Sequence, residues 1–272
     1  MSHKLTISCI ASVFILAACG QSEPDAMATA EEETAPAAAA APAPAPAMMS
    51  TAEKLAASGR SAEDKGRDAG RKPAEVLDFL GVEPGMAVID LMAAGGWYTE
   101  VLSVVVGDSG SVAAQNPSFL LAFNDGAMGT ALSERIGDRL TNVTKVDADW
   151  NELGMSGAQY DVALSALNMH DTYYMQSPEE SAEFMAATYA VLKPGGVFGV
   201  IDHAGNPDGD NGSLHRVDKG LAIELATAAG FIVEAESDLL ANSADDRTQG
   251  VFSEGLRGNT DRFILKLRKP AE

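Results

Sequence analysis

Cysteine is almost absent from this chain of 272 residues, which contains only two. Both of them, Cys9 and Cys19, lie near the amino terminus, so the rest of the sequence has no thiol for a disulfide, a metal or a nucleophile. Basic residues are also few. The chain has 19 Lys and Arg against 39 Asp and Glu, which gives a formal net charge of −20. Because so acidic a protein is repelled by nucleic-acid phosphates, we expect no DNA or RNA partner.

A long hydrophobic run is missing as well. The apolar run from Leu5 to Ala18 is too short to span a bilayer as a mature helix, and it leads into Leu16-Ala-Ala-Cys-Gly20. This ending resembles the signal of bacterial lipoproteins, in which the cysteine is lipidated and becomes the first residue. The alternative is an ordinary cleavage site beside an incidental cysteine. We favour a signal peptide over 1–18 and a lipid anchor at Cys19, on the periplasmic side of the bacterial cell envelope.

Residues 19–50 are acidic and then rich in Ala and Pro, including Pro42-Ala-Pro-Ala-Pro46. Proline blocks a regular helix, and this composition cannot form a core. We therefore expect a semi-extended tether, followed by one domain over 51–272. Hydrophobic residues make up 46% of the chain, which is enough for that domain to bury a full core.

The most informative segment of the domain is Ala87 to Glu100, with the sequence AVIDLMAAGGWYTE. A short apolar run ends at Asp90, a loop of small residues follows, and a helical pattern begins at Trp97. In such a strand–turn–helix unit, Gly and Ala let the backbone approach a nucleotide. No Lys-Ser or Lys-Thr follows the glycines, so a phosphate-binding P-loop is disfavoured. The carboxylate of Asp90 favours a nucleoside instead.

The order of the later segments resembles that of class I S-adenosylmethionine-dependent methyltransferases. Asp90-Leu-Met-Ala-Ala-Gly-Gly96 stands where this family has Asp-Leu-Gly-x-Gly-x-Gly. Three further expected strands lie over 111–116, 142–149 and 160–170, and a Leu-Lys-Pro-Gly-Gly segment begins the fifth, at 191–202. The resemblance extends over residues 73–268. It implies an α/β fold: a Rossmann-like three-layer sandwich with a mostly parallel seven-stranded sheet, whose late strands pair antiparallel at one edge.

Hydrophobic spacing and capping signals indicate where the helices lie. Ser177 is expected to cap a helix that has Pro178 at its first position. The helical segments we expect are 51–71, 73–80, 97–106, 177–192 and 213–229, and the late strands are 231–239 and 261–267.

The resemblance also implies S-adenosylmethionine as the cofactor, and it indicates which residues would bind it. At the small-residue turn these are Asp90, Met92, Ala94, Gly95 and Gly96. At the next two strand ends they are Asn116 for the ribose and Asp149 for the adenine, with Trp150 beside it. Met92 and Ala94 replace glycines of the family, and Asn116 replaces a carboxylate. An amide oxygen still accepts a hydroxyl hydrogen bond, but it lacks the charge that strengthens one.

A closer resemblance is to a branch of predicted bacterial methyltransferases that are often exported. No reaction can be assigned to that branch from these residues. The segments that carry the resemblance are 67–73 (RDAGRKP), 95–100 (GGWYTE), 168–171 (NMHD), 202–203 (DH), 214–216 (LHR) and 258–263 (GNTDRF).

Three histidines lie at or near the expected carboxyl ends of strands, where such sheets bind ligands. They are His170, His203 and His215, and the last is expected to open a helix. Methyl transfer needs a positioned acceptor and sometimes a base, so we expect His170, His203 and Asp171 to be catalytic. The alternative is that the histidines only cap strands and helices. With Asp202 they also suit zinc, but the spacing matches no metal motif, and no metal is expected.

Two groups near the turn have open interpretations. Arg67, Arg71 and Lys72 form a basic cluster that can receive an anionic substrate or pair with neighbouring carboxylates. Trp97 and Tyr98 can line a substrate pocket or belong to the core.

Two functions follow from the sequence. The first is an S-adenosylmethionine-dependent methyltransferase, anchored in the envelope and acting on a small molecule. It is favoured by the retained Asp90, Gly96 and Asp149. The second is a lipoprotein that keeps the fold as a binding or structural module without catalysis, and it is favoured by the altered glycines and ribose carboxylate.

Overall fold

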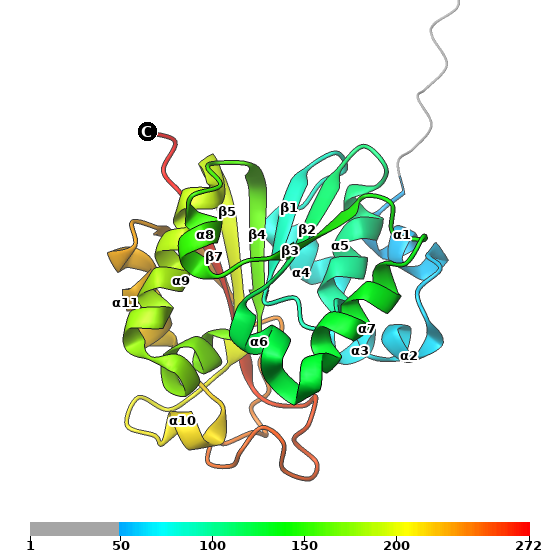
Figure 1. Ribbon diagram of the computed structural model, residues 1–272. Helices are drawn as coiled ribbons and strands as arrows, with labels where there is room; N and C mark the ends of the chain where they lie inside the picture. Colours follow the sequence, from blue (N-terminus) through cyan, green and yellow to red (C-terminus); the bar gives the residue numbers. More distant parts are fainter. Residues whose placement is uncertain (1–48) are drawn as a thin grey trace, which may run out of the picture. The chain divides into compact units, whose positions relative to one another are not determined.

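The computed structural model describes residues 49–272 (Figure 1). The expected signal peptide over 1–18, the lipidation site Cys19 and nearly all of the tether over 19–50 lie outside the described residues. These assignments stay predictions. Within residues 49–272, every helix is too short or too polar to cross a membrane.

A seven-stranded sheet forms the centre of the domain, in the order β3-β2-β1-β4-β5-β7-β6. The first five strands pair in parallel, and β7 runs antiparallel to both of its neighbours. The antiparallel late strands agree with the resemblance, but the sheet as a whole is mixed rather than mostly parallel. The strands are β1 (Ala87–Leu91), β2 (Ser111–Asn116), β3 (Val143–Asp147), β4 (Tyr160–Ala166), β5 (Leu192–His203), β6 (Ile232–Ser237) and β7 (Arg262–Arg268).

The mixed character of the sheet follows from the connection between β6 and β7. A parallel neighbour requires a crossover, usually through a helix that packs on one face of the sheet. Residues 238–261 contain no helix, so the chain turns back and β7 pairs antiparallel with both β6 and β5.

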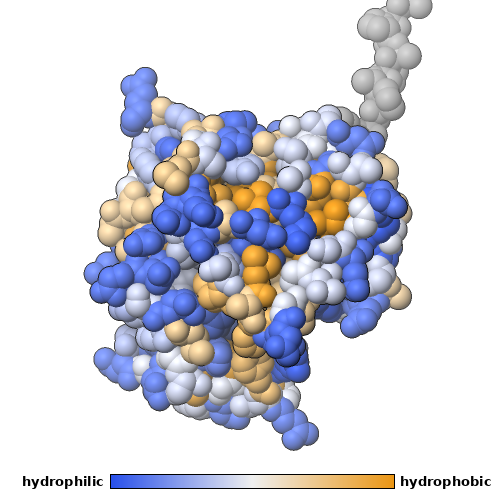
Figure 2. All heavy atoms as spheres, in the orientation of Figure 1, coloured by the Kyte–Doolittle hydropathy of each residue, from blue (hydrophilic) through white to orange (hydrophobic). Residues whose placement is uncertain are grey.

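Helices cover both faces of the sheet, which confirms the three-layer sandwich (Figure 1). Strand residues alternate between the layers, as in β1, where Val88 packs with the first layer and Ile89 with the second. Figure 2 shows hydrophobic residues gathered near the middle of one face, surrounded by hydrophilic ones. The first layer is formed by α1 (Thr51–Ala57), α4 (Pro73–Leu80) and α5 (Trp97–Val106), and the second by α8 (Trp150–Gly154), α9 (Pro178–Val191) and α11 (Lys219–Ala228).

The remaining helices are short, apart from α7. As expected, Ser177 caps α9, because its hydroxyl accepts the Glu180 N–H at 3.1 Å and Pro178 follows. The other helices are α2 (Ala62–Gly66), α3 (Asp68–Arg71), α6 (Ser118–Ala122), η1 (Phe123–Gly126), α7 (Ala127–Ile136), η2 (Asp171–Gln176) and α10 (Asn211–Leu214).

Two helical predictions were wrong in extent. The single helix expected over 51–71 is three helices, α1 to α3. The helix expected over 213–229 is interrupted, because Val217 pairs with the chain after β5: its N–H donates to His203 O at 3.0 Å. Asp218 then caps α11 by accepting the Leu221 N–H at 3.1 Å. His215 therefore lies at the end of α10 and does not open a helix.

Candidate functional site

The turn after β1 adopts the left-handed backbone conformation at three positions. The φ angles are +50° at Met92, +51° at Ala94 and +79° at Gly96. This conformation is costly for residues that carry a Cβ atom, so Met92 and Ala94 are held in it by neighbouring contacts. The Met92 N–H donates to Gln115 Oε1 at 3.1 Å. The turn therefore keeps a glycine-type geometry where the sequence has other residues.

Asn116 holds the same turn from the end of β2. Its Oδ1 accepts the Ala94 N–H at 2.8 Å, and its Nδ2 donates to Ala94 O at 3.2 Å. The side chain is fully buried. Both ends of the amide thus position the turn, and its expected contact with a ribose stays a prediction.

Met92 and Trp150 both belong to the core. The Met92 side chain is 3% exposed and packs in the cluster that contains Trp150 and Met169. Trp150 is equally buried, and its Nε1 has no hydrogen-bond partner within the described part of the chain. Asp149 is the residue before α8, but its side chain makes no capping hydrogen bond to that helix; its Oδ1 accepts the Ser118 N–H at 2.7 Å instead. The bulk of Met92 is therefore accommodated by the second helical layer.

Asp90 is buried at the end of β1. Its Oδ2 accepts the Thr99 hydroxyl hydrogen bond at 2.6 Å. Burial raises the pKa of Asp90 to about 7, although the Thr99 hydrogen bonds and the Arg71 charge lower it. This carboxyl group therefore titrates near neutrality, next to the turn.

Two adjoining cavities lie beside this turn. The turn cavity has a volume of about 350 Å³, and the arginine cavity has about 670 Å³. Arg67, Arg71 and Leu167 line both of them. Both volumes fall in the usual range of cavities that bind small molecules. The turn cavity is also lined by Asp90, residues 92–98 and Asn168, and the arginine cavity by His203, Phe252, Arg257, Thr260 and Arg262.

The arginine cavity contains two arginines, the partly buried Arg71 and the buried Arg262, that form no ion pair with a carboxylate of the described residues. The guanidinium of Arg71 makes no hydrogen bond or ion pair within residues 49–272, and it lies 4.5 Å from the centre of the Trp97 ring. Burial, together with the Arg67 charge, lowers the pKa of Arg71 to about 10. Arg262 is 8% exposed and donates to the carbonyl oxygens of Gly70 and Thr260. Because buried charges require a partner, this cavity suits an anion.

A larger cavity of about 880 Å³ lies beside α7. The two arginines that line it are already paired: Arg135 Nη1 lies 2.6 Å from both Asp64 and Glu100, and Arg139 Nη1 lies 2.6 Å from Glu100. We assign no site there.

A buried carboxylate organises the histidines. Asp202 is fully buried, and its Oδ1 lies 2.7 Å from His170 Nδ1. It also accepts the backbone N–H groups of His170 and His203. Burial lowers the pKa of His170, but the charge of Asp202 outweighs this effect and raises it above its ordinary value. Asp202 therefore fixes the orientation of the His170 ring.

His203 has a different environment. Its Nδ1 lies 2.7 Å from Thr260 Oγ1, and it lines the arginine cavity. Burial, together with the positive charges of His170, Arg262 and Arg216, lowers the pKa of His203 to about 3, although the charge of Asp202 raises it. The ring is therefore neutral near pH 7.

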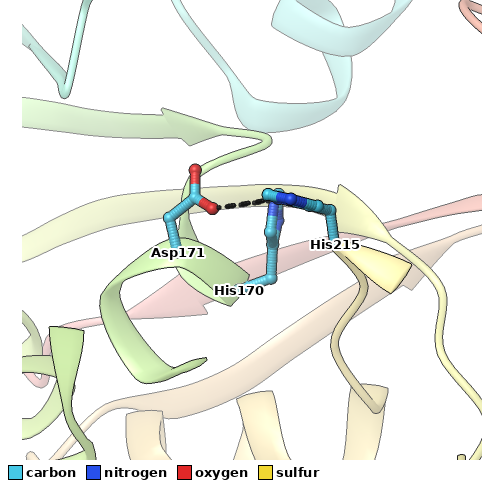
Figure 3. A group of neighbouring side chains, drawn as sticks. All are labelled: His170, Asp171 and His215. Atoms are coloured by element: carbon cyan, nitrogen blue, oxygen red, sulfur yellow. Dashed lines mark ion pairs between the residues drawn. The ribbon is translucent and has the colours of Figure 1, made fainter. Parts of the chain in front are cut away.

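His170, Asp171 and His215 form a cluster next to these residues, shown in Figure 3. Asp171 Oδ1 lies 3.3 Å from His170 Nε2 and 3.4 Å from His215 Nδ1. This set differs from the one weighed from the sequence, because Asp202 lies behind His170 and His203 faces Thr260. His170 and Asp171, both expected to be catalytic, line neither the turn cavity nor the arginine cavity.

The fold brings together the segments that carry the closer resemblance. Residues from 67–73, 95–100, 168–171, 202–203 and 258–263 line the two cavities. We did not single out Arg262, Thr260 or Phe252 as site residues, although the segment 258–263 was a signal for the first two. Phe252 lies in a loop without any such signal.

No family model matches this sequence, and no curated protein matches it. Solved structures do match. The fold is that of S-adenosylmethionine-dependent methyltransferases. One such enzyme, from Aquifex aeolicus, has 18% identity and a TM-score of 0.56, with 82% of this chain and 100% of the other chain covered. A protein from Bacillus halodurans C-125, assigned as a methyltransferase, has 17% identity and a TM-score of 0.52, covering 74% and 99%.

A protein from Galdieria sulphuraria, assigned as a sarcosine dimethylglycine methyltransferase, is similar to the same degree. It has 17% identity and a TM-score of 0.52, with 75% of this chain and 86% of the other covered. These likenesses establish the fold of the domain.

Gly96→Ala is expected to lower the free energy of unfolding by about 1–3 kcal/mol, because the residue has a left-handed φ. The added Cβ would also lie 2.6 Å from Leu132 Cδ1, so the buried Leu132 side chain would have to move. Gly95→Ala is the matched control, since its Cβ would lie 3.4 Å from Ala131 Cβ, an ordinary contact. Urea denaturation of both variants measures the difference, and equal losses would contradict this account of the turn.

Proposed function

We propose that this chain is an S-adenosylmethionine-dependent methyltransferase that acts on a small molecule. The observation that carries the proposal is the turn of residues 91–96, whose left-handed backbone lines a cavity at the carboxyl end of β1. Ligands of such sheets bind at this edge. The fold shared with known methyltransferases supports the same cofactor.

The adjoining arginine cavity supports a class of methyl acceptor. Arg71, Arg262 and their neighbours would hold a carboxylate or phosphate group of the acceptor. Since Arg71 lines both cavities, an acceptor held there would lie next to the turn. The cofactor supplies an electrophilic methyl group, and the chain's part is to align the acceptor with it.

Of the three residues expected to be catalytic, only His203 lines one of the two cavities. His203 lines the arginine cavity, and its neutral ring can donate or accept a hydrogen bond with a methyl acceptor bound there. We propose His203 as the residue that contacts the acceptor. His170 and Asp171 lie outside both cavities.

Calorimetry of the full chain with S-adenosylmethionine and with its demethylated product tests the cofactor. We expect binding of both ligands. Asp149→Asn should weaken it severalfold, because a hydrogen bond to a charged group contributes about 1 kcal/mol more than a neutral one. The amide retains an acceptor for the Ser118 N–H. Asp147→Asn, at the exposed end of β3, is the control and should bind normally.

Failure of both ligands to bind would favour the second function, a binding or structural module with a methyltransferase fold. The observation that supports this second function is the buried amide of Asn116, which already bonds the turn through both its oxygen and its nitrogen.

We also propose that Cys19 carries a lipid anchor, on the sequence Leu16-Ala-Ala-Cys19 after an apolar run. Cys19→Ala is expected to abolish acylation and release the protein from the membrane fraction. Cys9→Ala is the matched control, since the signal peptide that contains it is removed. Mass spectrometry of the mature amino terminus measures acylation, and cell fractionation measures release from the membrane. An unmodified chain that begins at Met1 would refute the anchor.

A further inference from the structure

We propose that His170, Asp171 and His215 bind one divalent transition-metal ion. Each residue offers one ligand atom, and these atoms all lie within 4.8 Å of one another. Figure 3 shows the Asp171 carboxylate turned toward the two imidazole rings.

The separations between the ligand atoms support a shared ion. The distances from Asp171 Oδ1, 3.3 Å to His170 Nε2 and 3.4 Å to His215 Nδ1, exceed the usual range of N–H···O hydrogen bonds. Two ligands that each lie about 2.1 Å from a tetrahedral ion are about 3.4 Å apart. The distance from the Asp171 oxygen to each nitrogen is therefore the distance expected between two ligands of one ion.

The residues behind the site prepare His170 for this role. Metal-binding histidines usually donate their second ring nitrogen to a carboxylate, which fixes the ring and its tautomer. The buried Asp202 occupies that position, 2.7 Å from His170 Nδ1, and directs Nε2 toward Asp171. Next to His215, the buried Arg216 bonds to Ala204 O, Gln249 O and Asp245 and anchors the end of α10.

The set of ligands indicates the class of metal. Two imidazoles and one carboxylate suit zinc and neighbouring first-row ions, whereas magnesium and calcium prefer oxygen ligands alone. Three protein ligands leave a coordination position open, which is typical of catalytic sites rather than structural ones. The side chains of Asp171 and His215 are 32% and 30% exposed, so that position is accessible.

The open position would lie beside the arginine cavity. The Phe252 ring packs 5.1 Å from the His215 ring and lines that cavity, and the His203 ring, 5.7 Å from that of His170, lines it as well. An ion here would be placed to contact an oxygen of a molecule in the cavity.

Titration of the chelator-treated full chain with Zn²⁺, followed by calorimetry, tests the site without any other ligand. One equivalent should bind in the wild type. Asp171→Asn and His215→Ala should each weaken binding at least tenfold. Both side chains are partly exposed, so both variants should fold, and thermal unfolding of the metal-free proteins checks this. Asp208→Asn is the matched control, because it removes the same charge from an exposed position outside the site.

Co²⁺ absorption separates this site from the two cysteines. Nitrogen and oxygen ligands give visible bands without the near-ultraviolet charge-transfer band of a thiolate. The proposal predicts visible bands that disappear in His215→Ala. It is overturned if the wild type binds neither ion, or if both variants bind Zn²⁺ as the wild type does. Because no methyl donor is present, neither result depends on the proposed methyltransferase activity.

Discussion

Arg216→Met is expected to lower the free energy of unfolding by about 3–5 kcal/mol, the usual cost of breaking a buried ion pair. Arg216 is fully buried, and its Nη1 lies 2.9 Å from Asp245 Oδ2. Its other donors satisfy Gln249 O and Ala204 O. Methionine fills similar space but leaves the carboxylate of Asp245 and both carbonyl groups without these donors.

Urea denaturation of the full chain, followed by circular dichroism, measures the loss. Arg257→Met is the control: Arg257 is exposed and forms no ion pair within the described residues. Its substitution should change stability by no more than about 0.5 kcal/mol. A loss below 1 kcal/mol for Arg216→Met would mean that water or a rearranged loop replaces the buried pair.

Asp90→Asn is expected to remove a dependence of stability on pH. The pKa of Asp90 is about 7 in the folded protein and 3.8 in an ordinary carboxyl group. Between these values the folded state binds the proton more tightly than the unfolded state does. The contribution of Asp90 is therefore fully present below about pH 4 and is lost as the pH rises through 7. The difference amounts to at most about 4 kcal/mol.

Unfolding of wild type and Asp90→Asn, measured from pH 4 to pH 8, isolates this effect, because other groups cancel in the difference. The free energy of unfolding of the variant should rise relative to that of the wild type as the pH rises. Its amide oxygen can still accept the Thr99 hydroxyl. Parallel stability curves would show that Asp90 titrates as an ordinary carboxyl group.

Local signals made most of the fold predictable. The apolar run that ends at Asp90 and the Ser177-Pro178 cap depend on neighbours in the sequence, and both were located correctly. The break at Val217 was missed because it results from pairing with the chain after β5, many residues away. A helical pattern in sequence does not reveal such a tertiary contact.

The candidate site was less predictable than the fold. The residues proposed to bind the cofactor follow from the order of motifs. The left-handed backbone at Met92 and Ala94 has no sequence signal, because only glycine is typical of that conformation. The sequence grouped Asp202 with the histidines, whereas its position behind His170 depends on how β5 is placed beside β4. The strand β7 was expected from the sequence, but the approach of Arg262 to Arg71 depends on where β7 lies in the sheet, between β5 and β6, which no local pattern specifies.

Arg71 makes the two cavities thermodynamically linked. Its charge lowers the pKa of Asp90 on one side, and it lines the arginine cavity on the other. An anion bound in the arginine cavity would offset this charge and so reduce the repulsion felt by a cationic sulfonium in the turn cavity. Linkage is reciprocal: by whatever factor the anion tightens binding of the sulfonium, the sulfonium tightens binding of the anion. One guanidinium that lines both cavities would thus be enough to make the two proposed ligands bind cooperatively.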